Sequence, residues 1–74
     1  MRHDFGEGFS KKSKREQFHY FRIARGSAYE VSSALDVADC FGVISKDHLL
    51  TGKDQCDHLA AMITRFMVSL GDRL

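Results

Sequence analysis

The sequence contains no proline and no tryptophan, and it has only two cysteines in 74 residues. Because proline interrupts helices, its absence favours long uninterrupted helices. No stretch approaches the roughly 20 apolar residues that a membrane-spanning helix needs, so no membrane segment is expected. The sequence also lacks an excess of one charge, because 11 Lys and Arg and 10 Asp and Glu give a net charge of +1. This balance does not indicate nucleic-acid binding by bulk charge.

The start of the chain, MRHDFGEGF, is polar and contains two glycines. It lacks the apolar core of a signal peptide, so we expect a cytoplasmic protein. Cys40 and Cys56 are then expected to be reduced. Residues 1–12 are predicted to be irregular, because their glycine, serine and lysine content gives no helical period.

Helix signals begin at Ser13. Ser13-x-x-Glu16 matches a capping box, in which the serine hydroxyl accepts a backbone N–H and the glutamate reaches back. No stop signal follows until Gly42, a favourable residue just beyond a helix end. GVIS at 42–45 is the expected connector, and its serine can cap a second helix. We predict an all-α fold, an antiparallel helical hairpin over residues 13–74 with helices at 13–41 and 46–70.

Apolar residues on both predicted helices recur at spacings of three and four, as at the a and d positions of a heptad. The first helix carries a second apolar stripe of Ile23, Ser27, Ala34, Val37 and Phe41. One hairpin cannot cover both stripes and buries little core. We therefore expect a homo-oligomer, most simply two hairpins that complete an up-down four-helix bundle. The residues expected to carry packing and the oligomer interface are Phe21, Ala24, Gly26, Ala28, Val31, Leu35, Leu59, Ile63, Phe66 and Leu70.

Gly26 is unusual because it lies inside the first predicted helix, where glycine costs about 1 kcal/mol relative to alanine. Ala24, Ser27 and Ala28 surround it with small side chains. Such a patch lets another backbone approach closely, so we predict a close helix crossing at Gly26. The alternative is a glycine tolerated on a solvent-facing side.

The stretch EGFSKKSKREQFHYFRIARGSAYEVSSAL, residues 7–35, resembles the middle of a bacterial family of small four-helix bundles, the 23S ribosomal RNA intervening-sequence proteins. Members carry an IAEGfgR segment, a Ser/Lys-rich link, a keF..fL helix start and an ArGSl.E core. The matching residues are Glu7, Gly8, Phe9, Ser13, Glu16, Phe18, Ala24, Arg25, Gly26, Ser27 and Glu30. The chain departs from the family where DFGEG replaces NIAEG and where Ser10-Lys11 replaces Gly-Arg. Its second helix matches only as an apolar pattern after a G-x-[IL]-S turn.

The resemblance implies an up-down four-helix bundle that forms ring-like homo-oligomers and has no established enzymatic activity. Members have two further helices before this segment, so the chain is expected to correspond to the C-terminal half of the bundle. Relatives in diversity-generating retroelements are accessory proteins that bind nucleic acid and a reverse transcriptase. The leading interpretation is a non-enzymatic scaffold or interaction module, and a nucleic-acid-binding accessory protein is the alternative.

Two charged groups of residues are candidate sites. Arg25 is a candidate for a partly buried ion pair, with Glu7 or a partner chain's carboxylate favoured over Glu30, which lies five residues away on the helix. An exposed Arg25 is the alternative. The basic run of Lys11, Lys12, Lys14 and Arg15 is a candidate for phosphate contacts, with His19, Tyr20 and Arg22 nearby. The alternative is a solvated segment.

No catalytic, metal or cofactor site is predicted. Cys40, Cys56, His48 and His58 show neither a CxxC pair nor an HExxH motif. In a hairpin that turns at 42–45, Cys56 lies opposite Val31 and too far from Cys40 for a disulfide. TGKD at 51–54 lacks the upstream glycine of a phosphate-binding loop. Two helices also offer no enclosed cleft, so neither an enzyme nor a small-molecule substrate is expected.

Overall fold

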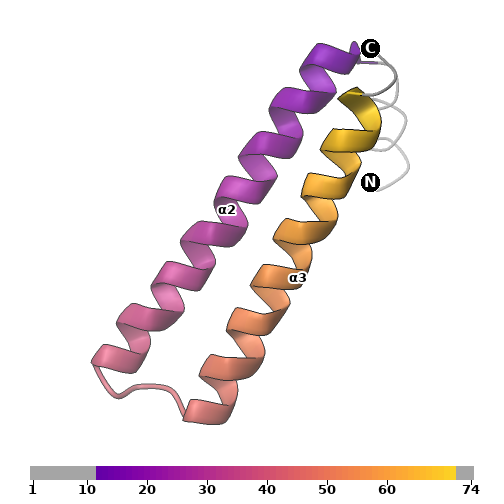
Figure 1. Ribbon diagram of the computed structural model, residues 1–74. Helices are drawn as coiled ribbons and strands as arrows, with labels where there is room; N and C mark the ends of the chain where they lie inside the picture. The colour runs from indigo at the N-terminus through magenta and orange to yellow at the C-terminus, as the bar shows by residue number, and fades with distance from the viewer. Residues whose placement is uncertain (1–11, 72–74) are drawn as a thin grey trace, which may run out of the picture.

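The computed structural model describes residues 12–71, in which two helices form a hairpin. Helix α2 (Lys14–Cys40) and helix α3 (Lys46–Gly71) run antiparallel, side by side along their whole lengths (Figure 1). The two helices lie next to each other and form a single layer. The predicted all-α hairpin is therefore confirmed. The predicted irregular segment 1–12 lies outside the described residues except for Lys12.

Helix α2 begins with the predicted capping box. The Ser13 Oγ accepts the Glu16 N–H, and the Glu16 Oε1 accepts the Ser13 N–H, each at 3.1 Å. The hydrogen bond from the Ser13 backbone, followed by the bond to its side chain, lowers the pKa of the Glu16 carboxyl. Because this pKa is lowered in the folded state, the cap contributes fully at neutral pH. The part contributed by the ionised Glu16 carboxylate is lost as the pH falls through the folded pKa, whereas the bond to the Ser13 Oγ does not titrate.

The end of α2 is closed by Gly42, whose φ of +70° is a left-handed conformation that glycine adopts without strain. The Gly42 N–H donates to the Asp39 carbonyl at 3.0 Å, and the Val43 N–H donates to the Ala38 carbonyl at 3.1 Å. These two bonds are a Schellman motif, which satisfies carbonyls that the helix end would leave unpaired. The chain is thereby turned back toward α3.

Helix α3 is capped by Ser45, whose Oγ accepts the His48 N–H at 3.1 Å. The Ser45 carbonyl also accepts the Leu49 N–H at 3.0 Å, the first bond of the helical ladder. The helix then continues through Gly52 without interruption.

The core between α2 and α3 is thin. Its buried residues are Ala28 on α2 and Leu49, Ala60, Ile63, Met67 and Leu70 on α3. Ala60 and Met67 each follow a heptad residue, Leu59 and Phe66, that the structure leaves about half exposed. The line along which α3 meets α2 therefore keeps Ile63 and Leu70 of the predicted pattern, and it passes through Ala60 and Met67 in place of Leu59 and Phe66. No large side chain among the described residues is completely buried, as expected of a two-helix unit.

We predict that Ser45→Ala lowers the free energy of unfolding by about 1 kcal/mol, because the His48 N–H loses its acceptor. Urea denaturation followed by circular dichroism measures this loss. Ser33→Ala, at an exposed position within α2, is the matched control and should leave stability unchanged or slightly raised. Equal stabilities for the two variants would contradict the capping role of Ser45.

Candidate assembly face

One side of the hairpin, here called the polar face, carries hydrogen bonds and ion pairs between the helices. Arg25 Nη1 donates a hydrogen bond to Thr64 Oγ1 at 3.0 Å. Lys53 Nζ lies 2.8 Å from Asp36 Oδ2 and 3.2 Å from Ser32 Oγ. Lys46 Nζ lies 3.1 Å from Asp39 Oδ1. The four α2 residues are separated by seven, four and three positions, which places them on one side of that helix. Polar groups on this face therefore satisfy one another or meet solvent.

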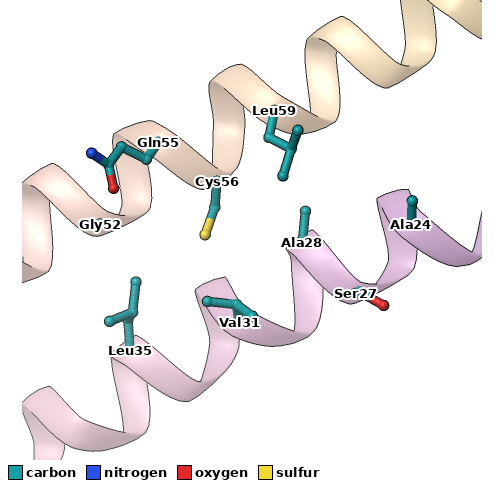
Figure 2. A pocket seen from close by; sticks show the side chains of 9 residues that line it. All are labelled: Ala24, Ser27, Ala28, Val31, Leu35, Gly52, Gln55, Cys56 and Leu59. Carbon is teal, nitrogen blue, oxygen red and sulfur yellow. The ribbon is translucent and has the colours of Figure 1, made fainter. Parts of the chain in front are cut away.

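A different side carries an open apolar groove of about 380 Å³. Figure 2 shows the nine lining residues, most of whose side chains lie between the two ribbons. We call this set the open face: Ala24, Ser27, Ala28, Val31, Leu35, Gly52, Gln55, Cys56 and Leu59. Only a serine hydroxyl, a glutamine amide and a thiol interrupt its apolar lining.

The two faces are distinct sides of α2. Three open-face residues directly precede a polar-face residue: Ala24 before Arg25, Val31 before Ser32, and Leu35 before Asp36. Successive residues of an α-helix are about 100° apart around its axis. The hairpin is thus held by polar contacts along one side and is open and apolar along another.

The open face leaves large side chains in contact with solvent. Val31 is 53% exposed and Leu59 is 46% exposed. Outside the groove, Phe66 is 51% exposed and lies beside Phe21, with ring centroids 5.9 Å apart. All four residues were expected in the packing interface, and the hairpin alone does not enclose them. The second predicted stripe is likewise exposed at Ile23, Ser27, Ala34, Val37 and Phe41.

The closest approach of the two helices at a glycine lies at Gly52. A Cβ atom at this position would come within 2.8 Å of the Leu35 Cδ1, so the absent side chain makes room for the leucine. A Cβ atom at Gly26 would meet nothing within 4 Å. The crossing predicted at Gly26 is therefore not part of the hairpin, and a contact there with another chain stays a prediction. Sequence reasoning could have found Gly52 from the register, which sets it opposite Leu35.

Arg25 is half-buried, and its described partner is the hydroxyl of Thr64. Within residues 12–71, ion pairs join Lys46 to Asp39 and Lys53 to Asp36, and Glu30 belongs to neither of these pairs. Glu7 lies outside the described residues, so its predicted pairing with Arg25 stays a prediction. The sequence did not indicate Thr64, because a hydroxyl acceptor carries no charge pattern.

The predicted basic run is split by the start of α2. Lys12 Nζ lies 5.3 Å from the centroid of the Tyr20 ring, whereas Lys14 and Arg15 are exposed. Lys11 lies outside the described residues. Arg15 lines a polar surface hollow of about 360 Å³ together with Glu16, His19, Tyr20 and Arg22.

Cys40 and Cys56 are both free thiols. Cys56 lies in the groove with Val31, the neighbour that the hairpin register predicts. Within residues 12–71, no three His, Cys, Asp or Glu side chains are arranged to hold a metal ion. Neither described helix is long and apolar enough to cross a membrane.

These features define a class, a small all-α hairpin with one polar face and one open apolar face. The chain belongs to the 23S rRNA-intervening sequence protein family, whose model matches residues 3–65. This confirms the resemblance inferred from residues 7–35 and extends it into α3. No curated protein and no solved structure matches the chain.

We predict that two glycine-to-alanine substitutions raise the free energy of unfolding by different amounts. Gly26→Ala should stabilise the hairpin by about 1 kcal/mol, because the helix gains propensity without a steric conflict. Gly52→Ala should gain clearly less, because Leu35 must move to admit the methyl group. Urea denaturation at one fixed protein concentration compares the variants. An equal gain for both would show that Gly52 is not a close-packing position.

Proposed function

We propose that this protein is a non-enzymatic, self-associating helical module, and that a second copy of the chain covers the open face. The observation that carries the proposal is the apolar groove of about 380 Å³, bordered by half-exposed Val31 and Leu59. Contiguous apolar surface that is open to solvent is a feature by which protein–protein interfaces are recognised. The name of the matched family refers to an intervening sequence of 23S rRNA and to no reaction, and a scaffold role is compatible with it.

The dimensions of the hairpin favour a partner of equal size. Helices α2 and α3 have 27 and 26 residues, so the side of the hairpin that they form is about 40 Å long. Covering it requires a partner as long as the hairpin itself, and a second hairpin supplies two helices of that length. The result is a four-helix arrangement with the core that one hairpin lacks. The polar face needs no such cover, because its charged groups are already hydrogen-bonded or solvated.

We predict that Leu59→Glu weakens self-association about 10- to 100-fold. The variant removes the burial of one leucine, worth about 1.5–3 kcal/mol, and puts a charge in the interface. Leu50→Glu is the matched control, because Leu50 lies on the same helix, is 65% exposed and does not line the groove. Sedimentation velocity over a concentration series measures both variants.

The proposal predicts that Leu50→Glu associates like the wild-type chain while Leu59→Glu shifts toward the monomer. Circular dichroism of each variant at matched concentration separates lost association from lost helix. A wild-type chain that is a folded monomer at every concentration would overturn the proposal. So would equal association of the two variants.

A second candidate function, nucleic-acid binding, is supported by the hollow at the start of α2. Arg15, His19 and Arg22 are spaced by four and three residues, so they lie on one side of the helix. Tyr20 is 44% exposed beside them, and the His19 ring meets it edge-on at 5.9 Å. Cationic groups next to an accessible aromatic ring are the elements that contact phosphates and stack on bases of single strands.

For this candidate, the double variant Arg15→Ala/Arg22→Ala should weaken binding of a single-stranded oligonucleotide and flatten its salt dependence. Each lost phosphate contact lowers the slope of log affinity against log salt by about 0.7. Fluorescence anisotropy with a labelled oligonucleotide measures both quantities. Lys46→Ala, at the other end of the hairpin, is the control and should change neither. No measurable binding by the wild-type chain at low salt would exclude this function.

A further inference from the structure

The small net charge conceals a separation of charge along the hairpin. Its open end, residues 12–25 and 59–71, carries six Lys and Arg and one Glu, a net charge of +5. Its turn end, residues 26–58, carries two Lys and six Asp and Glu, a net charge of −4. Because the helices are antiparallel, their backbone dipoles largely cancel, and the side chains set the polarity of the hairpin.

This polarity distinguishes the two ways in which a second copy can lie on the open face. With both turns at the same end, positive meets positive and negative meets negative. With the turns at opposite ends, the positive open end of each copy lies against the negative turn end of the other copy. Charge complementarity of this kind steers association and suppresses the wrong orientation. The apolar groove itself carries no charged side chain that would set an orientation.

We propose that the second copy packs with its turn at the opposite end, related to the first by a two-fold axis across the groove. This inference rests on the proposed self-association and specifies its geometry. It differs from the up-down bundle expected from the sequence, in which the turns of both hairpins lie at the same end. An axis near Val31 and Cys56, which face each other across the groove, leaves groove residues on both sides of it. Each copy then presents the same surface to the other, as a two-fold interface requires.

Cys40 offers a native reporter of this geometry, because it is exposed and lies near the turn. It follows Val31 by nine residues, or about 13.5 Å along α2. Two spin labels on Cys40 should therefore lie about 27 Å apart along the bundle when the turns are at opposite ends. When the turns share an end, the same labels should lie within about 20 Å, since only the width of a helix pair separates them.

The experiment is pulsed electron paramagnetic resonance on the full chain carrying Cys56→Ala and a label at Cys40. A second sample carries Cys56→Ala, Cys40→Ala and Ser69→Cys, which moves the label to the open end at an exposed position. Light scattering on each labelled sample establishes first that it associates. Association is also measured at about 50 and 500 mM salt, because added salt screens charge and leaves apolar burial in place.

The expected result is a long distance for both labels and association that weakens as salt is added. Short distances for both labels, with association strengthened by salt, would overturn the orientation and leave the proposed self-association standing. A wild-type chain that stays monomeric under the same conditions would overturn both the orientation and the self-association. Light scattering distinguishes these two failures.

Discussion

The apolar contact between α2 and α3 is the interaction on which the rest of this molecule depends. It places Phe21 beside Phe66 and Leu35 beside Gly52. These two pairs define one antiparallel register, in which each residue further along α2 faces a residue one position earlier in α3. The Schellman turn at Gly42 and the cap at Ser45 bring the helices into this register. Because a single layer of helices buries so little, this contact alone gives a thin core, and the hairpin gains stability from any partner that covers it.

The consequence is a hairpin whose sides differ in chemistry. Side chains of opposite polarity alternate around α2, so that Val31 is turned to the groove and Ser32 to the polar face. Surface ion pairs such as Lys53 with Asp36 contribute little stability on their own. They keep one side of the hairpin solvated, and the apolar side is the one on which we propose that another copy docks.

Much of this fold follows from local signals in the sequence. The Ser13–Glu16 capping box, the glycine stop at 42 and the serine before α3 are interactions between residues close in the chain, so sequence spacing predicts them. The family match confirms the resemblance that the ArGSl.E pattern suggested. The antiparallel register also followed, because a short connector fixes which residues face each other, as Val31 and Cys56 do.

The candidate site was less predictable, because it depends on how α3 rotates against α2. The heptad spacing put Leu59 and Phe66 on the contact line, whereas the structure uses Ala60 and Met67 and leaves the larger residues half exposed. A helix that is apolar over a wide arc does not specify which residues face its neighbour. The Arg25–Thr64 hydrogen bond was missed for a related reason, since a neutral acceptor on another helix leaves no sequence signal.

The central claim is that the open face is covered by another copy of the chain. Light scattering coupled to size-exclusion chromatography tests it most directly, on the wild-type chain over a range of concentrations. The account predicts a mass above that of the 8.4 kDa chain, approaching a defined multiple as concentration rises. A folded species that stays at 8.4 kDa throughout would contradict it, because the apolar groove would then have no partner.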